Sequence, residues 1–240
     1  MGTDGSARVL VLAPMRSELR PLQKKMSLKR SVSGQAAVYE GRVDGVGVVA
    51  ATIGVGPAIA SKTTRRLLES FRVDRVVVSG IAGAVDLGLR IGEVMVPETV
   101  IDAETGAEYR TDRLGAIEPA GTILTTSELI TGPAEVEALR RRGVRAVEME
   151  GSGVAEVCTQ MGIPWTLFRS ISDRADEGVV DDSVLAMLNE DGSTNVGAAL
   201  RLIVARPGRL KNLMKLARDS QSAAGAAADA TIAAIRTLAG

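Results

Sequence analysis

Short apolar runs that alternate with helix-like segments are the feature that most limits the fold of this chain. Residues 8–12 and 73–78 are rich in Val and Leu and stand between turn residues, as buried strands do. Helices are expected at 58–69 and 151–161, and a further strand is expected near 163–168. Strands that alternate with helices predict an α/β fold with a mostly parallel central sheet.

The remaining segments complete this outline. Asp44-Gly45 separates two apolar runs and predicts a hairpin. Residues 104–118 are polar and lack periodicity, which predicts an exposed loop. The other expected elements are a helix or turn at 17–22, hairpin strands at 37–43 and 46–53, strand segments at 92–97, 100–102 and 122–126, a short helix at 134–142, and helices near 196–204, 210–219 and 223–238.

The length and charge of the chain limit its organisation and partners. With 240 residues, no fixed-period repeat and no convincing linker, residues 1–240 are expected to form one domain. Lys and Arg number 29, as do Asp and Glu, so the balanced charge argues against a nucleic-acid partner. No apolar run approaches the roughly 18 residues needed to span a bilayer, and no signal-peptide core is visible. The single Cys158 fits a reducing, cytoplasmic location.

The absence of histidine restricts the chemistry of this chain. It excludes Ser-His-Asp and Cys-His catalysis and makes a zinc site improbable, so no metal is predicted. The glycines at 80–83 do not have the spacing of a dinucleotide fingerprint, and no cofactor is predicted. Chemistry near neutral pH is therefore expected to depend mainly on carboxylates.

Two segments carry carboxylates where chemistry is plausible. Glu148-Met149-Glu150 precedes the expected helix at 151–161, and the two acids share one face if the segment is a strand. Asp173 is expected just past the end of a buried strand that also contains Arg169, which is costly to bury unless a carboxylate or a bound anion pairs with it. Simpler explanations stay open, because an acid at a helix start is favoured by the dipole, and Asp173 or Ser172 could cap a helix.

Glycine-containing breaks follow three expected strands, at 54–56, 80–83 and 150–151. In open α/β sheets, ligands lie outside the carboxyl ends of strands, where small residues let a ligand approach the backbone. Taken alone, each break is more often an ordinary strand-to-helix turn.

At these residues the chain resembles the nucleoside phosphorylase superfamily, and within it the 5'-methylthioadenosine/S-adenosylhomocysteine nucleosidases. The similarity extends over about 8–176 and is carried by the ordered motifs at 13–18, 79–83, 147–150 and 169–176. It implies a single-domain, three-layer αβα fold with a central mixed, mostly parallel sheet, followed by a divergent helical region at about 177–240. It also implies a homodimer that hydrolyses an adenosine-type nucleoside to free adenine and a 5'-substituted ribose.

The resemblance assigns a role to each matching residue. Glu18 corresponds to the acid that activates the attacking water, Asp173 to the acid that serves purine N7 with the support of Ser172, and Arg169 to an arginine near the water. This division between two carboxylates is the logic of glycoside hydrolysis. The substrate-binding positions that the resemblance implies are Glu150 at the ribose hydroxyls, Met149 and Met15 at the sugar, Ile130 at the purine edge, and Gly83 in the glycine motif.

Some positions depart from the nucleosidase pattern. Ile81 stands where relatives usually have Ser or Thr, Leu129 stands where they usually have a stacking Phe, and Val78 stands where the phosphorylases usually have an Arg. The segment from Glu177 onward is more similar to hopanoid-associated phosphorylases, which are thought to act on an adenosyl lipid. Phosphorolysis of a purine nucleoside or an adenosyl-hopane-like substrate, and a non-catalytic nucleoside-binding protein, are the alternatives. Water is favoured as nucleophile because a phosphate dianion needs cationic and hydroxyl donors.

Overall fold

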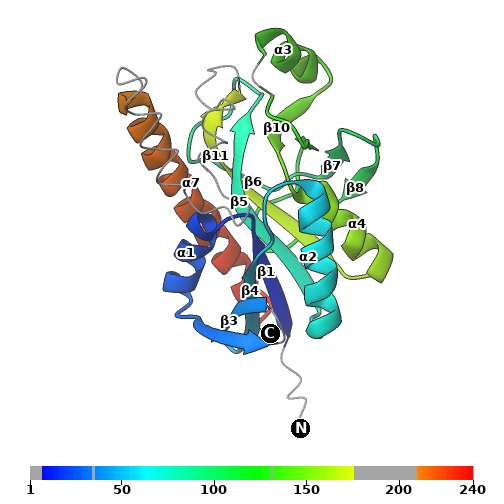
Figure 1. Ribbon diagram of the computed structural model, residues 1–240, viewed down its shortest axis with the longest axis vertical. Coiled ribbons are helices and arrows are strands. Elements are labelled where there is room, and N and C mark those ends of the chain that lie inside the picture. Colours follow the sequence, from blue (N-terminus) through cyan, green and yellow to red (C-terminus); the bar gives the residue numbers. More distant parts are fainter. Residues whose placement is uncertain (1–6, 34–35, 131, 176–209, 240) are drawn as a thin grey trace.

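A computed structural model describes residues 7–33, 36–130, 132–175 and 210–239, and one sheet extends through this part of the chain (Figure 1). Its strands are β1 (Arg8–Ala13), β2 (Lys29–Ser33), β3 (Ala36–Val43), β4 (Val46–Thr52), β5 (Arg75–Ala84), β6 (Val94–Met95), β7 (Thr99–Asp102), β8 (Glu108–Arg110), β9 (Thr122–Thr125), β10 (Val144–Glu148) and β11 (Trp165–Arg174). The helices are α1 (Arg16–Lys25), α2 (Pro57–Ser70), α3 (Pro133–Arg141), α4 (Gly151–Met161) and α7 (Leu210–Arg236).

Helices cover both faces of the sheet, so the described residues form three layers. Helices α2 and α4 pack together on one face, and α1 and α7 pack together on the other (Figure 1). The alternation of β1 explains this arrangement, because successive side chains of a strand point to opposite faces. Leu10 and Leu12 belong to the apolar core with α2 and α4, whereas Val9 and Val11 belong to the core with α1 and α7.

The sheet is mixed, as the resemblance to the nucleoside phosphorylase superfamily implies. Parallel pairing joins the central strands β4, β1, β5 and β11, and a second parallel group consists of β10, β9 and β7. Antiparallel pairing occurs at the margins, in β2–β3–β4, β7–β8 and β11–β6, and where β10 meets the end of β5. That the whole chain is one domain stays a prediction.

The two longest strands place the candidate site. Strand β5 continues through the glycine motif to Ala84, beyond the expected end at 78, because β11 pairs with it along its whole second half. The register between them shifts between Ile171 and Asp173 and then resumes, so β11 extends to Arg174. Asp173 therefore lies within a paired strand and not just past its end, which corrects the sequence expectation.

Other local expectations have mixed outcomes. The hairpin is confirmed: β3 and β4 pair around Asp44 and Gly45, whose φ angles of 46° and 91° suit a tight hairpin turn. The expected loop at 104–118 contains β8, a three-residue edge strand whose only half-buried side chain, Tyr109, gives too little periodicity to predict it. Strand β2 was not expected from the sequence.

The expected helices at 210–219 and 223–238 are one helix, α7. Residues 220–222 contain neither Gly nor Pro, so nothing there ends the helix, and its apolar side packs on β11 and β5. The helix expected near 196–204 and the divergent region from 177 to 209 lie outside the described residues. Among the helices that are described, none has the length and apolar character to cross a membrane.

Candidate active site

Arg169 lies at the centre of the site, fully buried in the middle of β11. Its Nη2 donates to Glu148 Oε2 and, at 3.1 Å, to Glu150 Oε2. Its Nη1 lies 4.0 Å from Glu18 Oε1. Burial alone lowers the pKa of a guanidinium, but the three carboxylates raise the pKa of Arg169 above its usual value. Of the two partners that the sequence leaves open for this buried arginine, a carboxylate or a bound anion, the structure shows carboxylates.

Glu18 is placed by the start of α1. It stands at the third helical position, where its Oε2 accepts a hydrogen bond from the Met15 amide at 3.1 Å and so helps to satisfy the helix terminus. Its Oε1 accepts from the Ile81 amide of β5 at 2.9 Å. Burial raises the pKa of Glu18 to about 7, against the opposing effect of the Arg169 charge.

Glu148 and Glu150 approach Arg169 from the junction of β10 and α4. Glu148 is the last residue of β10 and Glu150 is the N-cap of α4, so they converge on the arginine although only Glu148 is in a strand. Glu148 accepts from the amides of Glu150 and Gly151 at 2.9–3.1 Å and from the Thr125 hydroxyl. Glu150 Oε1 accepts from the Gly56 amide at 3.3 Å, and burial raises the pKa of Glu150 to about 8.

Gly80 allows the cluster to form. A Cβ atom on Gly80 would overlap Arg169 Nη1 and come within 2.5 Å of Glu18 Oε1. The glycine of β5 thus lies directly beneath the arginine and the acid. The sequence indicated the glycine motif but not which glycine has this function.

A second group of predicted residues lies around the end of β11. Asp173 is half-buried, and its Oδ1 accepts a hydrogen bond from the Ser172 hydroxyl. A Cβ on Gly83 would lie 3.5 Å from both Asp173 Oδ2 and Val147 Cγ2, which is an ordinary contact distance, so Gly83 lies directly beside this acid. Ile130 lies nearby in the aliphatic cluster that consists of Val85, Leu124, Ile130, Val136, Leu139, Val144 and Ala175.

The two predicted methionines lie at helix starts. Met15 is half-buried at the N-cap of α1, and Met149 is half-buried between Glu148 and Glu150. The structure thus brings Glu18, Glu150 and Arg169 into one cluster and Asp173, Ser172 and Gly83 into another on the same strands. Glu148 contacts the first cluster and Thr125 contacts Glu148, and neither has a role assigned from sequence, because their pairing depends on the register of β9 and β10.

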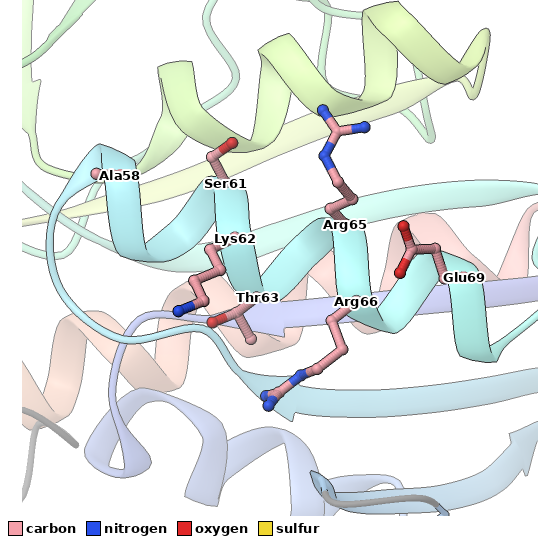
Figure 2. A pocket seen from close by; sticks show the side chains of 7 residues that line it. All are labelled: Ala58, Ser61, Lys62, Thr63, Arg65, Arg66 and Glu69. Atoms are coloured by element: carbon pink, nitrogen blue, oxygen red, sulfur yellow. The ribbon is translucent and has the colours of Figure 1, made fainter.

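A separate shallow hollow lies on the outer surface of α2 and contains none of these residues. It is lined by one helix only, with the charged side chains of Lys62, Arg65, Arg66 and Glu69 along it (Figure 2). Within the described ranges, no group of three or more acidic or cysteine side chains is arranged to hold a metal ion.

Comparisons with known proteins bear on the family and the fold of this chain. The sequence model of the phosphorylase superfamily matches residues 8–120 and 116–205. A 5'-methylthioadenosine/S-adenosylhomocysteine nucleosidase of Geobacillus kaustophilus is 29% identical over 201 residues, covering 71% of this chain and 86% of the relative. The nucleosidase of Neisseria meningitidis, solved with methylthio-immucillin-A, has a TM-score of 0.74 at 21% identity over 96% of this chain and 99% of that chain. Futalosine hydrolase of Helicobacter pylori has a TM-score of 0.75 at 19% identity over 98% and 100%.

Proposed function

The chain belongs to the phosphorylase superfamily, and on that premise we propose that it hydrolyses the N-glycosidic bond of an adenosine-type nucleoside. The products are free adenine and a ribose that carries a 5'-substituent. The substrate class follows the curated relatives named as 5'-methylthioadenosine/S-adenosylhomocysteine nucleosidases.

The observation that carries this proposal is the space between Arg169 and Glu18. Arg169 Nη1 is buried and has no hydrogen-bond partner within the described residues, and it lies 4.0 Å from Glu18 Oε1. Buried donors are normally satisfied, and a polar separation beyond 3.5 Å commonly holds a bridging water. A water held there would be oriented by the guanidinium and deprotonated by Glu18. Since the pKa of Glu18 is about 7, its basic form is available near neutral pH.

The leaving base is assigned to the second cluster. Cleavage builds negative charge on the purine, which a proton donor at N7 neutralises. Asp173 is the acid in this position, and the Ser172 hydroxyl orients its carboxyl group. The aliphatic cluster with Ile130 is assigned to the purine as an apolar surface beside that acid, and Gly83, next to Asp173, adds no side chain of its own there.

The ribose is assigned to the space between the two clusters. Glu150 in its ionised form is the acceptor for the 2' and 3' hydroxyls, because its carboxylate has two oxygens and, among the described residues, Arg169 and the Gly56 amide hold it. Met149 and Met15 supply apolar contacts to the sugar from their half-buried positions.

Water is favoured over phosphate by the charges at this position. Three carboxylates surround one guanidinium, and the Ile81 amide that an anion would use donates to Glu18 instead. Arg16 and Arg20 do not substitute for a phosphate-binding arginine, because both are exposed while Glu18 is buried. Residues two positions apart on a helix point about 200° away from each other, so Glu18 and these arginines occupy different faces of α1.

The test is the identity of the sugar product. Pure protein is incubated with 5'-methylthioadenosine in H₂¹⁸O, with and without phosphate, and the products are analysed by mass spectrometry. The proposal expects free adenine in both buffers and ¹⁸O on the anomeric carbon of the sugar. A dominant sugar 1-phosphate would establish the phosphorylase alternative, and no adenine under either condition would favour a binding protein or a different 5'-substituent.

A further inference from the structure

We propose that Thr125 is a positioning residue for this reaction: its hydroxyl holds Glu148, and through Glu148 it fixes the Arg169 guanidinium between Glu18 and Glu150. The proposal rests on the hydrolysis proposed above and adds the residue that keeps its charged centre in place.

Thr125 reaches the cluster through the sheet. It is the last residue of β9, it is 1% exposed, and it is paired with Glu148 in the parallel register of β9 and β10. Its oxygen accepts a hydrogen bond from the Ser152 amide at 2.9 Å. Because the Ser152 amide can only donate, it does not use the single hydroxyl proton of Thr125. That proton is donated to Glu148 Oε1, since a carboxylate can only accept.

The Glu148 carboxylate accepts hydrogen bonds from several donors. Besides the Thr125 hydroxyl, it accepts the amides of Glu150 and Gly151 and the Nη2 group of Arg169. The network extends one step further, because the Ser152 hydroxyl donates to Asp102 Oδ2 at 2.6 Å at the end of β7. The ends of β7, β9 and β10 are therefore tied to one carboxylate. Of these donors, the Thr125 hydroxyl is the side chain that can be changed without removing a charge.

The position of the Arg169 guanidinium depends on the Glu148 carboxylate. Only its Nη2 makes hydrogen bonds within the described residues, and the two acceptors are Glu148 and Glu150. Glu150 is assigned to the ribose, so it exchanges partners when the substrate binds. Glu148 is then the permanent anchor of the guanidinium, and a shift of Glu148 moves Arg169 relative to Glu18.

The position of Arg169 contributes to the protonation of Glu18. The groups that face Glu18 are Arg169 from β11, Glu148 and Glu150 from the β10–α4 junction, and the amides of Ile81 and Met15. The Arg169 charge lowers the pKa of Glu18 against the larger effect of burial. If the guanidinium moves away, the pKa of Glu18 rises, and the acid limb of the rate profile moves to higher pH.

The experiment compares three variants at matched folded concentration. Thr125→Val removes the hydroxyl and keeps the shape, and Thr125→Ser restores the hydroxyl. Thr166→Val is the matched control: Thr166 is a buried threonine on β11 that also accepts one hydrogen bond, from Arg75, and donates one, to the Asp112 carbonyl. Thr166 lies near the start of β11 and contacts no carboxylate of the cluster.

The proposal expects Thr125→Val to lower kcat on the order of tenfold or more, with a smaller change in KM, since hydrogen bonds to charged groups are the strong ones. The acid limb of the pH–rate profile of Thr125→Val moves to higher pH, and the kcat of Thr125→Ser stays within a few-fold of the wild-type value. Thr166→Val loses stability but keeps the wild-type kcat and acid limb. If Thr125→Val matches Thr166→Val in kcat and in the acid limb, the hydroxyl is only structural and the proposal is wrong.

A second measurement does not need catalysis. The carbonyl infrared band of protonated Glu18, assigned by its loss in Glu18→Gln, is titrated in the ligand-free protein. A higher midpoint in Thr125→Val than in wild type and Thr125→Ser supports the positioning role, and an equal midpoint overturns it. A sugar 1-phosphate product from the wild-type protein would refute the proposed hydrolysis, and this titration would still decide the role of Thr125.

Discussion

Arg169 and Asp173 lie four residues apart on β11, yet the two ends of the proposed site are built differently. Around Arg169, every charged side chain is almost fully buried, and each carboxylate accepts backbone amides as well as facing the guanidinium. Around Asp173, the acid is half-buried, it accepts the Ser172 hydroxyl, and the aliphatic cluster that contains Ile130 and Ala175 lies nearby. The end around Arg169, called the charged end, is held by the sheet and the helix starts. The end around Asp173, called the base end because the purine base is assigned to it, offers a surface and one acid.

The difference follows from the cost of burying charge. An unpaired buried charge costs several kcal/mol, so the Arg169 end folds only with its partners in place. An aliphatic surface carries no such requirement, and its shape can be completed by a ligand. Changes at the base end should therefore affect catalysis and leave the fold intact, whereas changes at the charged end should affect catalysis, protonation and stability together.

The largest effect is expected for Asp173→Asn. The amide has nearly the shape of the acid but cannot give a proton to purine N7, and general acid catalysis is typically worth about 10²–10⁴-fold. Turnover should fall by that range while the circular dichroism spectrum and the melting temperature stay close to wild type. Full activity of the variant would remove Asp173 from the mechanism.

Glu18→Gln should cause a loss in the same range of about 10²–10⁴-fold, because the water then has no base. Adenine binding, measured by calorimetry, should survive, since the purine is assigned to the other end. In contrast to Asp173→Asn, this variant should also change stability, because the neutral amide removes a buried acid whose pKa burial raises to about 7. Equal turnover in Glu18→Gln and wild type would exclude Glu18 as the base.

Glu150→Gln should weaken nucleoside binding by roughly 10- to 100-fold, because one acceptor of the ribose hydroxyls becomes a donor. The check is the discrimination between a riboside and its 2',3'-dideoxy analogue, which should be much smaller in the variant than in wild type. If the variant binds ribosides as well as wild type does, Glu150 is an acid favoured only by the start of α4.

Gly80→Ala at the Arg169 end and Gly83→Ala at the Asp173 end make the same change at both ends of the proposed site. They therefore test whether the two ends differ in stability. The new methyl group at Gly80 would overlap Arg169 Nη1, and overpacking typically costs about 1–3 kcal/mol. At Gly83 the methyl group meets its neighbours at 3.5 Å, an ordinary contact, so stability should change by less than about 0.5 kcal/mol while KM rises several-fold. Urea unfolding and steady-state kinetics separate the two. Equal destabilisation by both changes would contradict the difference between the ends.

The sequence predicts many of the helices and strands, because in these segments the local sequence pattern agrees with the final structure. The bounds of α4 at Gly151–Met161 are those expected, and the hairpin follows from Asp44-Gly45. The cost of burying Arg169 predicts a nearby carboxylate, and the structure supplies Glu148, Glu150 and Glu18.

The rest depends on pairing between distant segments. Asp173 was expected after β11 because a local pattern does not reveal that the strand passes an irregularity at 171–173 and pairs again with β5. Thr125 has no distinguishing sequence context, and only the β9–β10 register places its hydroxyl against Glu148. The function of Gly80 follows from two side chains that approach it from α1 and β11, neither of them close in sequence.

The last expected effect is a pH dependence of stability, and it belongs to the charged end alone. Burial raises the pKa of Glu18 to about 7 and of Glu150 to about 8 from ordinary values of 4.5. The folded protein therefore keeps protons that the unfolded chain releases, and the free energy of unfolding should fall as pH rises from about 4.5 to about 8, by up to about 1.4 kcal/mol per pH unit for each of the two acids. Urea unfolding of the ligand-free protein measures this slope. The double variant Glu18→Gln/Glu150→Gln should flatten it, whereas Glu69→Gln on the exposed side of α2 should not. An unchanged slope in the double variant would mean that these two acids are ionised in the folded protein throughout this range, which would contradict the protonation proposed for the charged end.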